Sequence, residues 1–175
     1  MALRRFCSVV VLAGGLLGGS VSSGFSAKDS AITTSGLPVP RYVSLKSDHV
    51  NVRAGPTKDN DVAWVYTRSG LPVEITAEFE NWRRVRDSEG AEGWVYHSLL
   101  SGRRTAVITM KNKDDLASLY DRADATSAVV ARLQAGVVAQ VRHCAAGWCH
   151  VAGNGFDGWI EQQRLWGVYA GENVD

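Results

Sequence analysis

The stretch that decides the fold is Val50-Asn51-Val52-Arg53-Ala54-Gly55-Pro56, followed later in the chain by Asn81-Trp82 and Gly93-Trp94-Val95. Between the first two motifs, residues 71–79 place an apolar side chain at every second position. A period of two predicts a β-strand with one face in a core. Turn-forming residues at 80–81 and 88–90 follow, so the region is expected to fold as a short β-meander.

The same pattern recurs about 66 residues later, which indicates an internal repeat. The matching positions are Gly70 and Gly136, Trp82 and Trp148, and Gly93-Trp94-Val95 and Gly158-Trp159-Ile160. Upstream of these positions, residues 50–53 align with 117–120 and residues 62–66 with 128–132. The chain is therefore expected to hold two copies of one small unit.

The expected fold class is all-β, because no segment keeps a helical period over three turns. Residues 114–119 fit a helix or a strand, and residues 97–100 fit one short helical turn. Strands of about five residues in a unit of about 60 residues favour a small barrel, since an open sheet of that size leaves its edges unpaired.

In order and spacing, the motifs Val50 to Pro56, Asn81-Trp82 and Gly93-Trp94-Val95 resemble the bacterial SH3-like domain, a family of exported β-barrel modules. The resemblance implies two tandem SH3-like barrels, at residues 42–102 and 105–167, and a C-terminal tail at 168–175. The second copy has Ser118-Leu119-Tyr120-Asp121-Arg122-Ala123 where the first has its loop motif. The family works mainly in recognition, which implies binding to cell-wall peptidoglycan or to an envelope protein.

The N-terminus has the layout of a secretory signal peptide: two arginines within residues 1–5, an uncharged apolar run at 6–19, and small residues at 20–24. Residues 1–27 are expected to be the signal and processing region, cut between Ser23 and Ala27, and residues 28–41 a linker. An uncleaved anchor is the alternative, although the run is shorter than the roughly 18 residues that a spanning helix needs. The predicted location is periplasmic or secreted, with no stable membrane span after signal removal.

The charge balance argues against a nucleic-acid partner. The chain has 19 basic and 18 acidic residues, and loss of the signal arginines leaves 17 basic residues. Nucleic-acid binders usually carry a basic excess or stripe. The basic side chains near the strand motifs alternate with apolar ones, which favours a solvated strand face; they are Arg83, Arg84, Arg86, Arg103 and Arg104.

Removal of the signal would take Cys7 with it and leave Cys144 and Cys149, for which a disulfide is predicted in an oxidising compartment. Free buried thiols and a zinc or copper site with His143 and His150 are the alternatives. Adjacent strand residues point to opposite faces, so His143 and Cys144 are poorly placed to chelate one ion. No hydrolase, phosphate-loop or metalloprotease motif occurs, and we expect a non-enzymatic protein without cofactor or metal.

Aromatic residues are the candidates for both packing and recognition. Because they recur in both copies, Trp82, Trp94, Trp148 and Trp159 are predicted to pack in the cores. The predicted ligand-binding side chains are Trp64, Tyr66, Tyr96 and His97. Two functions stay open at this point: a module that binds peptidoglycan or an envelope protein, and a structural or assembly subunit whose second barrel supports the first.

Overall fold

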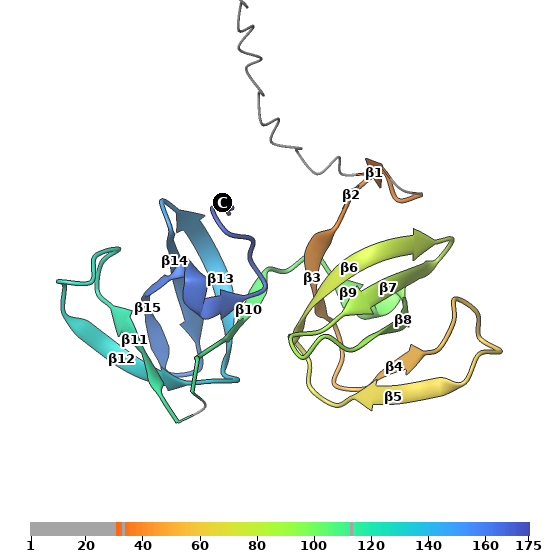
Figure 1. The fold of residues 1–175 in the computed structure, drawn as a ribbon, viewed down its shortest axis with the longest axis horizontal. Helices are drawn as coiled ribbons and strands as arrows, with labels where there is room; N and C mark the ends of the chain where they lie inside the picture. The colour runs from red at the N-terminus through yellow and green to blue at the C-terminus, as the bar shows by residue number, and fades with distance from the viewer. Residues whose placement is uncertain (1–30, 33, 113) are drawn as a thin grey trace, which may run out of the picture.

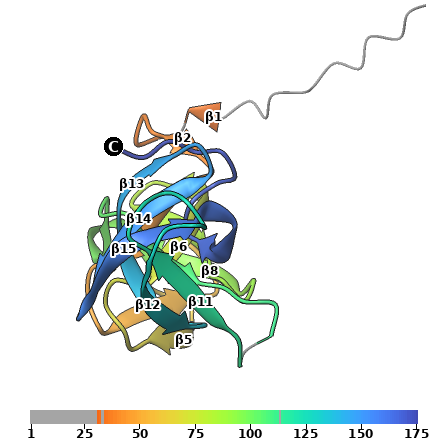
Figure 2. The same ribbon diagram turned by 90° about the vertical axis from the view of Figure 1, so that its left-hand side faces the viewer.

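The computed structural model describes residues 31–32, 34–112 and 114–175 (Figure 1). Within them the chain is all-β, as predicted, with two seven-stranded sheets and a two-stranded hairpin. The two large sheets form two barrel-like units that lie side by side in Figure 1 and one behind the other in Figure 2. Within these ranges no helix is long and apolar enough to cross a membrane. The predicted signal region, residues 1–27, lies outside the described residues.

Barrel 1 is an antiparallel sheet in the strand order β5-β4-β8-β7-β6-β3-β9. Its elements are β3 (Arg41–Leu45), β4 (Val50–Arg53), β5 (Val62–Tyr66), β6 (Pro72–Phe79), β7 (Trp82–Arg86), β8 (Glu92–Tyr96), the 3-10 helix η1 (His97–Leu99) and β9 (Leu100–Ser101). The alternating segment 71–79 supplies β6, and the short turn expected at 97–100 is η1.

Barrel 2 repeats this order as β12-β11-β15-β14-β13-β10-β16. Its elements are β10 (Thr105–Ile108), β11 (Leu116–Tyr120), β12 (Val129–Gln134), β13 (Val138–Ala145), β14 (Trp148–Gly153), β15 (Phe156–Glu161), the 3-10 helix η2 (Gln162–Arg164) and β16 (Leu165–Trp166). The ambiguous segment 114–119 therefore contributes to a strand, β11.

Strand register confirms the upstream repeat alignment at one place and corrects it at another. Arg53 pairs with Trp94 as Tyr120 pairs with Trp159, so 50–53 and 117–120 are equivalent. Arg53 also pairs with Val62, whereas Tyr120 pairs with Val129. The predicted match of 62–66 to 128–132 is therefore wrong by one residue. The second copy is then one residue shorter in the turn after this strand, because Leu133 lies three residues before Gly136 whereas Tyr66 lies four residues before Gly70.

Each barrel encloses its own apolar core. Barrel 1 buries Leu45, Val50, Val52, Val73, Ile75, Val85 and Val95. Barrel 2 buries a larger cluster around Ile108, Leu119, Val151 and Ile160. The pairing of β6 with β7 shifts register between Ile75 and Ala77, and that of β13 with β14 shifts at the matching place. A bulge of this kind bends a strand and raises its twist, which helps each small sheet curl around its core.

The predicted disulfide is confirmed: Cys144 and Cys149 are bonded across β13 and β14, and both are fully buried. Their histidine neighbours point to the other side of the sheet, and His143 and His150 remain partly exposed. Closing this short loop stabilises the fold by roughly 2 kcal/mol in the chain-entropy model. Since the two sulfurs bond to each other, they are not available as metal ligands while the bond is intact.

Both ends of the described chain fold against the barrels. The segment expected to be a linker contains β1 (Ala31–Ile32) and β2 (Pro38–Val39), which pair with each other, and Val39 packs against the core of barrel 1. The segment expected to be a C-terminal tail buries Val168 and Val174 in barrel 2, and Val174 forms a β-bridge with Cys144. The ordered units thus extend beyond the boundaries expected from the repeat.

The C-terminal segment also joins the two barrels. The ring of Tyr42, on β3, lies 4.6 Å from that of Tyr169 and 5.1 Å from that of Trp166. The Tyr169 hydroxyl donates a hydrogen bond of 2.9 Å to Glu74, which is buried in β6 and also accepts from Arg86. We call Tyr42, Glu74, Trp166 and Tyr169 the interface cluster. It fixes β3 and β6 against the end of barrel 2.

The interface cluster predicts an alkaline transition. Burial, and then the charge of Glu74, raise the pKa of Tyr42 from 10.0 to about 12, and burial also raises the pKa of Tyr169. Because the folded state holds these phenol protons more tightly than the unfolded chain, their contribution to stability is complete below pH 10. The contribution of Tyr42 is lost as the pH rises through about 12. We expect the near-ultraviolet circular dichroism of the cluster to fall in that window. A spectrum unchanged after the phenols ionise would contradict this coupling.

Candidate functional site

An aromatic row crosses the end of barrel 1, built by neighbouring residues of three strands. Phe79 on β6 pairs with Trp82 on β7, which pairs with Tyr96 on β8. Directly paired residues share a face, and the Trp82 and Tyr96 rings meet edge to face at 5.4 Å. His97 follows, with its ring 5.1 Å from that of Tyr96. Phe79 is 48% exposed although it is a large apolar residue, so the row presents aromatic surface to solvent.

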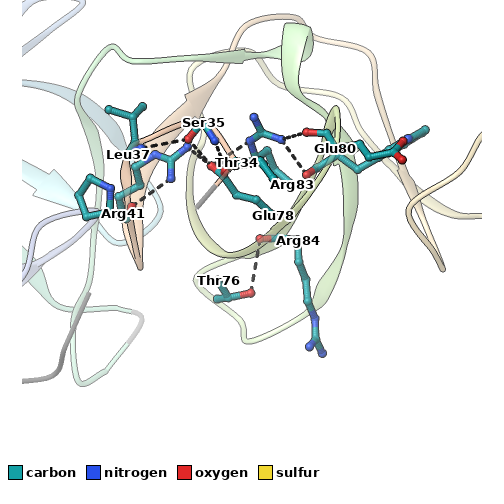
Figure 3. Close-up of polar contacts among 11 residues, drawn as sticks. Thr34, Ser35, Leu37, Arg41, Thr76, Glu78, Glu80, Arg83 and Arg84 are labelled. Atoms are coloured by element: carbon teal, nitrogen blue, oxygen red, sulfur yellow. Dashed lines mark hydrogen bonds and ion pairs between the residues drawn. The ribbon is translucent and has the colours of Figure 1, made fainter. Parts of the chain in front are cut away.

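A buried carboxylate holds the turn that carries this row (Figure 3). The Glu78 side chain is fully buried and makes ion pairs with Arg41 at 2.6 Å and Arg83 at 3.1 Å. Arg83 in turn donates to the carbonyl oxygens of Glu80, at 2.8 Å, and Trp82, at 2.9 Å. Charge-assisted hydrogen bonds of this kind are stronger than neutral ones. The β6–β7 turn, and with it the spacing of Phe79 and Trp82, is therefore held from beneath.

The segment before β3 closes over the same carboxylate. The backbone N–H of Ser35 donates to Glu78 at 2.9 Å and its hydroxyl at 2.8 Å, and the hydroxyl of Thr34 donates at 3.2 Å (Figure 3). Arg41, at the start of β3, also donates a hydrogen bond to the Glu78 carboxylate. The expected linker thus contributes directly to the support of the aromatic row. The sequence offers no motif for this role, since its residues are ordinary linker residues.

The four predicted ligand-binding residues lie in two pairs. Tyr96 and His97 belong to the aromatic row. Trp64 and Tyr66 lie on β5 with their rings 6.0 Å apart, and both pack against the core of barrel 1. The Tyr66 hydroxyl donates to Asp87 at 2.9 Å, and burial raises the pKa of this phenol. Ligand binding by all four residues stays a prediction. The contacts of Trp64 and Tyr66 also give these two residues a structural role.

Of the repeated tryptophans that were predicted to pack in the cores, only Trp82 is buried, at 8% exposure, and it too belongs to neither core cluster. Trp94, Trp148 and Trp159 are partly exposed and lie outside both core clusters. In β8 it is Gly93 that faces inward, because a Cβ there would meet the side chain of Val52 and, at 3.2 Å, the Arg53 carbonyl oxygen. Alternation then turns the next residue, Trp94, outward.

Barrel 2 carries different chemistry at the place of the aromatic row. Ala145 pairs with Trp148, and Trp148 pairs with Glu161, so these residues stand where barrel 1 has Phe79, Trp82 and Tyr96. The 3-10 helix η2 begins with buried Gln162 rather than an exposed histidine. The row formed by Phe79, Trp82, Tyr96 and His97 is therefore a property of barrel 1, although Trp148 and Trp159 of barrel 2 are also partly exposed. Phe79 and Trp82 were not among the predicted ligand-binding residues, since Trp82 was assigned to the core. Phe79 ends the alternating segment 71–79, which is the signal that could have pointed to it.

The basic residues near the strand motifs are mostly neutralised. Arg83, Arg84 and Arg86 make ion pairs with Glu78, Glu92 and Glu74. Arg104 makes one with Glu172 at 2.7 Å. Arg84 and Arg86 are exposed, which agrees with the predicted solvated strand face rather than a nucleic-acid stripe. That prediction is wrong for Arg83, which is buried against Glu78. The Arg103 side chain is exposed, and within the described ranges it enters no ion pair.

A family model described as bacterial SH3 domain matches residues 46–102 and 113–167. The chain belongs to this family. The two matched regions cover each barrel from the residues after its first strand, β3 or β10, to its end, so the SH3-like repeat expected from the sequence is confirmed. Domains of the bacterial SH3 family are generally binding modules for peptidoglycan or proteins.

Two solved structures are distantly similar to this bacterial SH3 protein. NlpC2 from Trichomonas vaginalis aligns with a TM-score of 0.33 and 14% identity over 73% of this chain and 48% of that one. NlpC1 from the same organism aligns with a TM-score of 0.32 and 16% identity over 79% of this chain and 49% of that one. The chain spans about half the length of these proteins. No curated protein sequence matches it.

Proposed function

We propose that this protein is an exported, non-enzymatic binding module that recognises cell-wall peptidoglycan through the aromatic row of barrel 1. The observation that carries the proposal is the alignment of Phe79, Trp82 and Tyr96 across three neighbouring strands, with His97 at its end. Aromatic faces of this kind bury the apolar faces of sugars and peptides, while Tyr and His add polar contacts. The N-terminal signal layout supports the export of such a module.

Rigid support adds to the case for recognition. The Glu78 network holds the turn beneath the row, and the backbone N–H of His97 donates to the carbonyl oxygen of Asn81 at 2.9 Å. A surface that is already ordered loses little conformational freedom when a ligand binds, which raises affinity. The cysteine pair does not suggest catalysis, because the disulfide leaves no thiolate nucleophile at Cys144 or Cys149.

Pelleting with purified sacculi tests the proposal. We expect the mature protein to sediment with sacculi, and the double variant F79A/Y96A to bind at least tenfold more weakly, since each truncation removes a contact worth about 1 kcal/mol or more. The matched control is L116A in barrel 2, because Leu116 and Phe79 are each 48% exposed. The control should sediment like the unaltered protein.

Two outcomes would overturn the proposal. If the unaltered protein stays in the supernatant, the ligand is not peptidoglycan, and an envelope protein or an assembly role takes its place. If F79A/Y96A and L116A sediment equally well, binding does not use the aromatic row. Release of soluble wall fragments by the purified chain would contradict the non-enzymatic part.

A further inference from the structure

A cleft of about 370 Å³ lies between the two barrels, away from the aromatic row. Barrel 1 and the connection after it contribute Lys46, Ser69, Ser101 and Arg103, and barrel 2 contributes Gln140 and Gly153. The volume falls within the range of about 300–1,000 Å³ typical of ligand pockets, which often form at domain interfaces. The cleft exists only because the barrels are held together.

The charge of this cleft is positive and uncompensated. Lys46 and Arg103 are both exposed, and neither takes part in an ion pair within the described chain. Among the described residues that line the cleft there is no aspartate or glutamate. The neighbouring Arg104 is paired with Glu172, whereas Arg103 has no carboxylate partner among the described residues. Two cations facing a polar cleft favour an anionic ligand.

The floor of the cleft is fixed by hydrogen bonds between the barrels. The Ser44 hydroxyl lies 2.7 Å from that of Thr105, which donates to the carbonyl oxygen of Gly70 at 2.7 Å. Ser44 also donates to the carbonyl oxygen of Arg103. This anchors the backbone of Arg103 and leaves its guanidinium to reach a ligand. The planar guanidinium group of arginine can donate two parallel hydrogen bonds to one carboxylate.

We propose that this cleft binds a short peptide that carries free carboxylates, with Lys46 and Arg103 as the anion-binding side chains. The remaining lining supports a peptide over a bare inorganic anion. Ser69, Ser101 and Gln140 offer hydroxyl and amide groups along the cleft, and Ser101 lies in β9, an edge strand of its sheet. An edge strand has unpaired backbone groups to which an extended peptide can bind. This site is separate from the one proposed for peptidoglycan.

Triglutamate is a suitable probe, followed by NMR of the folded mature protein. We expect saturable shifts of the Ser101, Gln140 and Gly153 amides, and affinity at least tenfold weaker in K46Q and in R103Q, since each variant loses a charge-assisted contact. R132Q is the matched control, because Arg132 is an exposed cation on β12 that lines no part of the cleft. The tripeptide of three glutamines with an amidated C-terminus, which carries no carboxylate, should give no saturable shifts.

The outcomes separate this proposal from the first one. Y96A should bind triglutamate like the unaltered protein, even if it no longer sediments with sacculi. Equal affinities of K46Q, R103Q and R132Q would overturn the proposal, and so would the absence of shifts in the unaltered protein. If inorganic phosphate perturbs the same amides as strongly as triglutamate does, the peptide assignment is wrong. Circular dichroism of each variant confirms that it is folded.

Discussion

The variant G167A is expected to lower the free energy of unfolding by about 3–5 kcal/mol. Gly167 follows β16, is buried, and has a φ of 125°, a conformation in which residues with a Cβ are strained by about 1–3 kcal/mol. A Cβ would also meet the carbonyl oxygen of Thr105 and lie 2.9 Å from the Cα of Ala106. These are backbone atoms of β10 and cannot turn aside, and such overpacking costs about 1–3 kcal/mol.

The destabilisation caused by G167A should extend to the C-terminal segment. The carbonyl oxygen of Gly167 accepts a hydrogen bond from Arg104, and the next two residues are Val168, which is buried in barrel 2, and Tyr169, which contacts Tyr42. We expect the segment after residue 167 to become accessible to proteases. Chemical denaturation measures the loss of stability, and limited proteolysis followed by mass spectrometry maps the released segment.

Two matched glycines separate the causes. Gly171 has a φ of 73° but open space around the position of a Cβ, so G171A should cost only about 1 kcal/mol. Gly102 also has open space and lies in the connection between the barrels, so G102A should be close to neutral. If G167A is no worse than G171A, the close approach of the backbone at β10 does not matter and the explanation fails.

The sequence predicted those features that depend on local alternation. The period of two in residues 71–79 became β6, because every second residue of a strand lies on the same face. The hairpin of Cys144 and Cys149 became a buried disulfide, because residues paired across two strands also share a face. The prediction that the repeated tryptophans pack in the cores was wrong, and strand alternation also explains this error. Large apolar residues were assigned to the core, whereas in β8 the close approach of Val52 reserves the inward position for Gly93.

Features that join distant segments could not be predicted from pattern. Glu74 and Tyr169 are 95 residues apart, and neither the C-terminal segment nor the residues before β3 have a strand period. Their partners are side chains that become neighbours only after both barrels have formed. The same applies to the cleft between the barrels, whose cations Lys46 and Arg103 are ordinary surface residues in the sequence.

Y42A should uncouple the two barrels. Tyr42 is the member of the interface cluster that contacts both Trp166 and Tyr169, at 5.1 and 4.6 Å between ring centroids. Truncation removes both ring contacts, and the expected loss is about 2–4 kcal/mol because the side chain is only partly buried. The hydrogen bonds between the barrels remain, among them those of Tyr169 with Glu74 and of Thr105 with Gly70, but each is worth only about 1–3 kcal/mol.

Uncoupling is measurable because each barrel has its own core and can fold without the contact. We expect a single unfolding transition in the unaltered protein and two in Y42A, together with faster tumbling of each barrel in NMR relaxation. Y120A is the control, since Tyr120 contacts Trp148 edge to face at 5.6 Å inside barrel 2 and spans no interface. It should destabilise barrel 2 and leave tumbling unchanged. Because the cleft is lined by both barrels, Y42A should also weaken triglutamate binding. If the barrels of Y42A still tumble slowly and together, the interface cluster is not what holds the two barrels together.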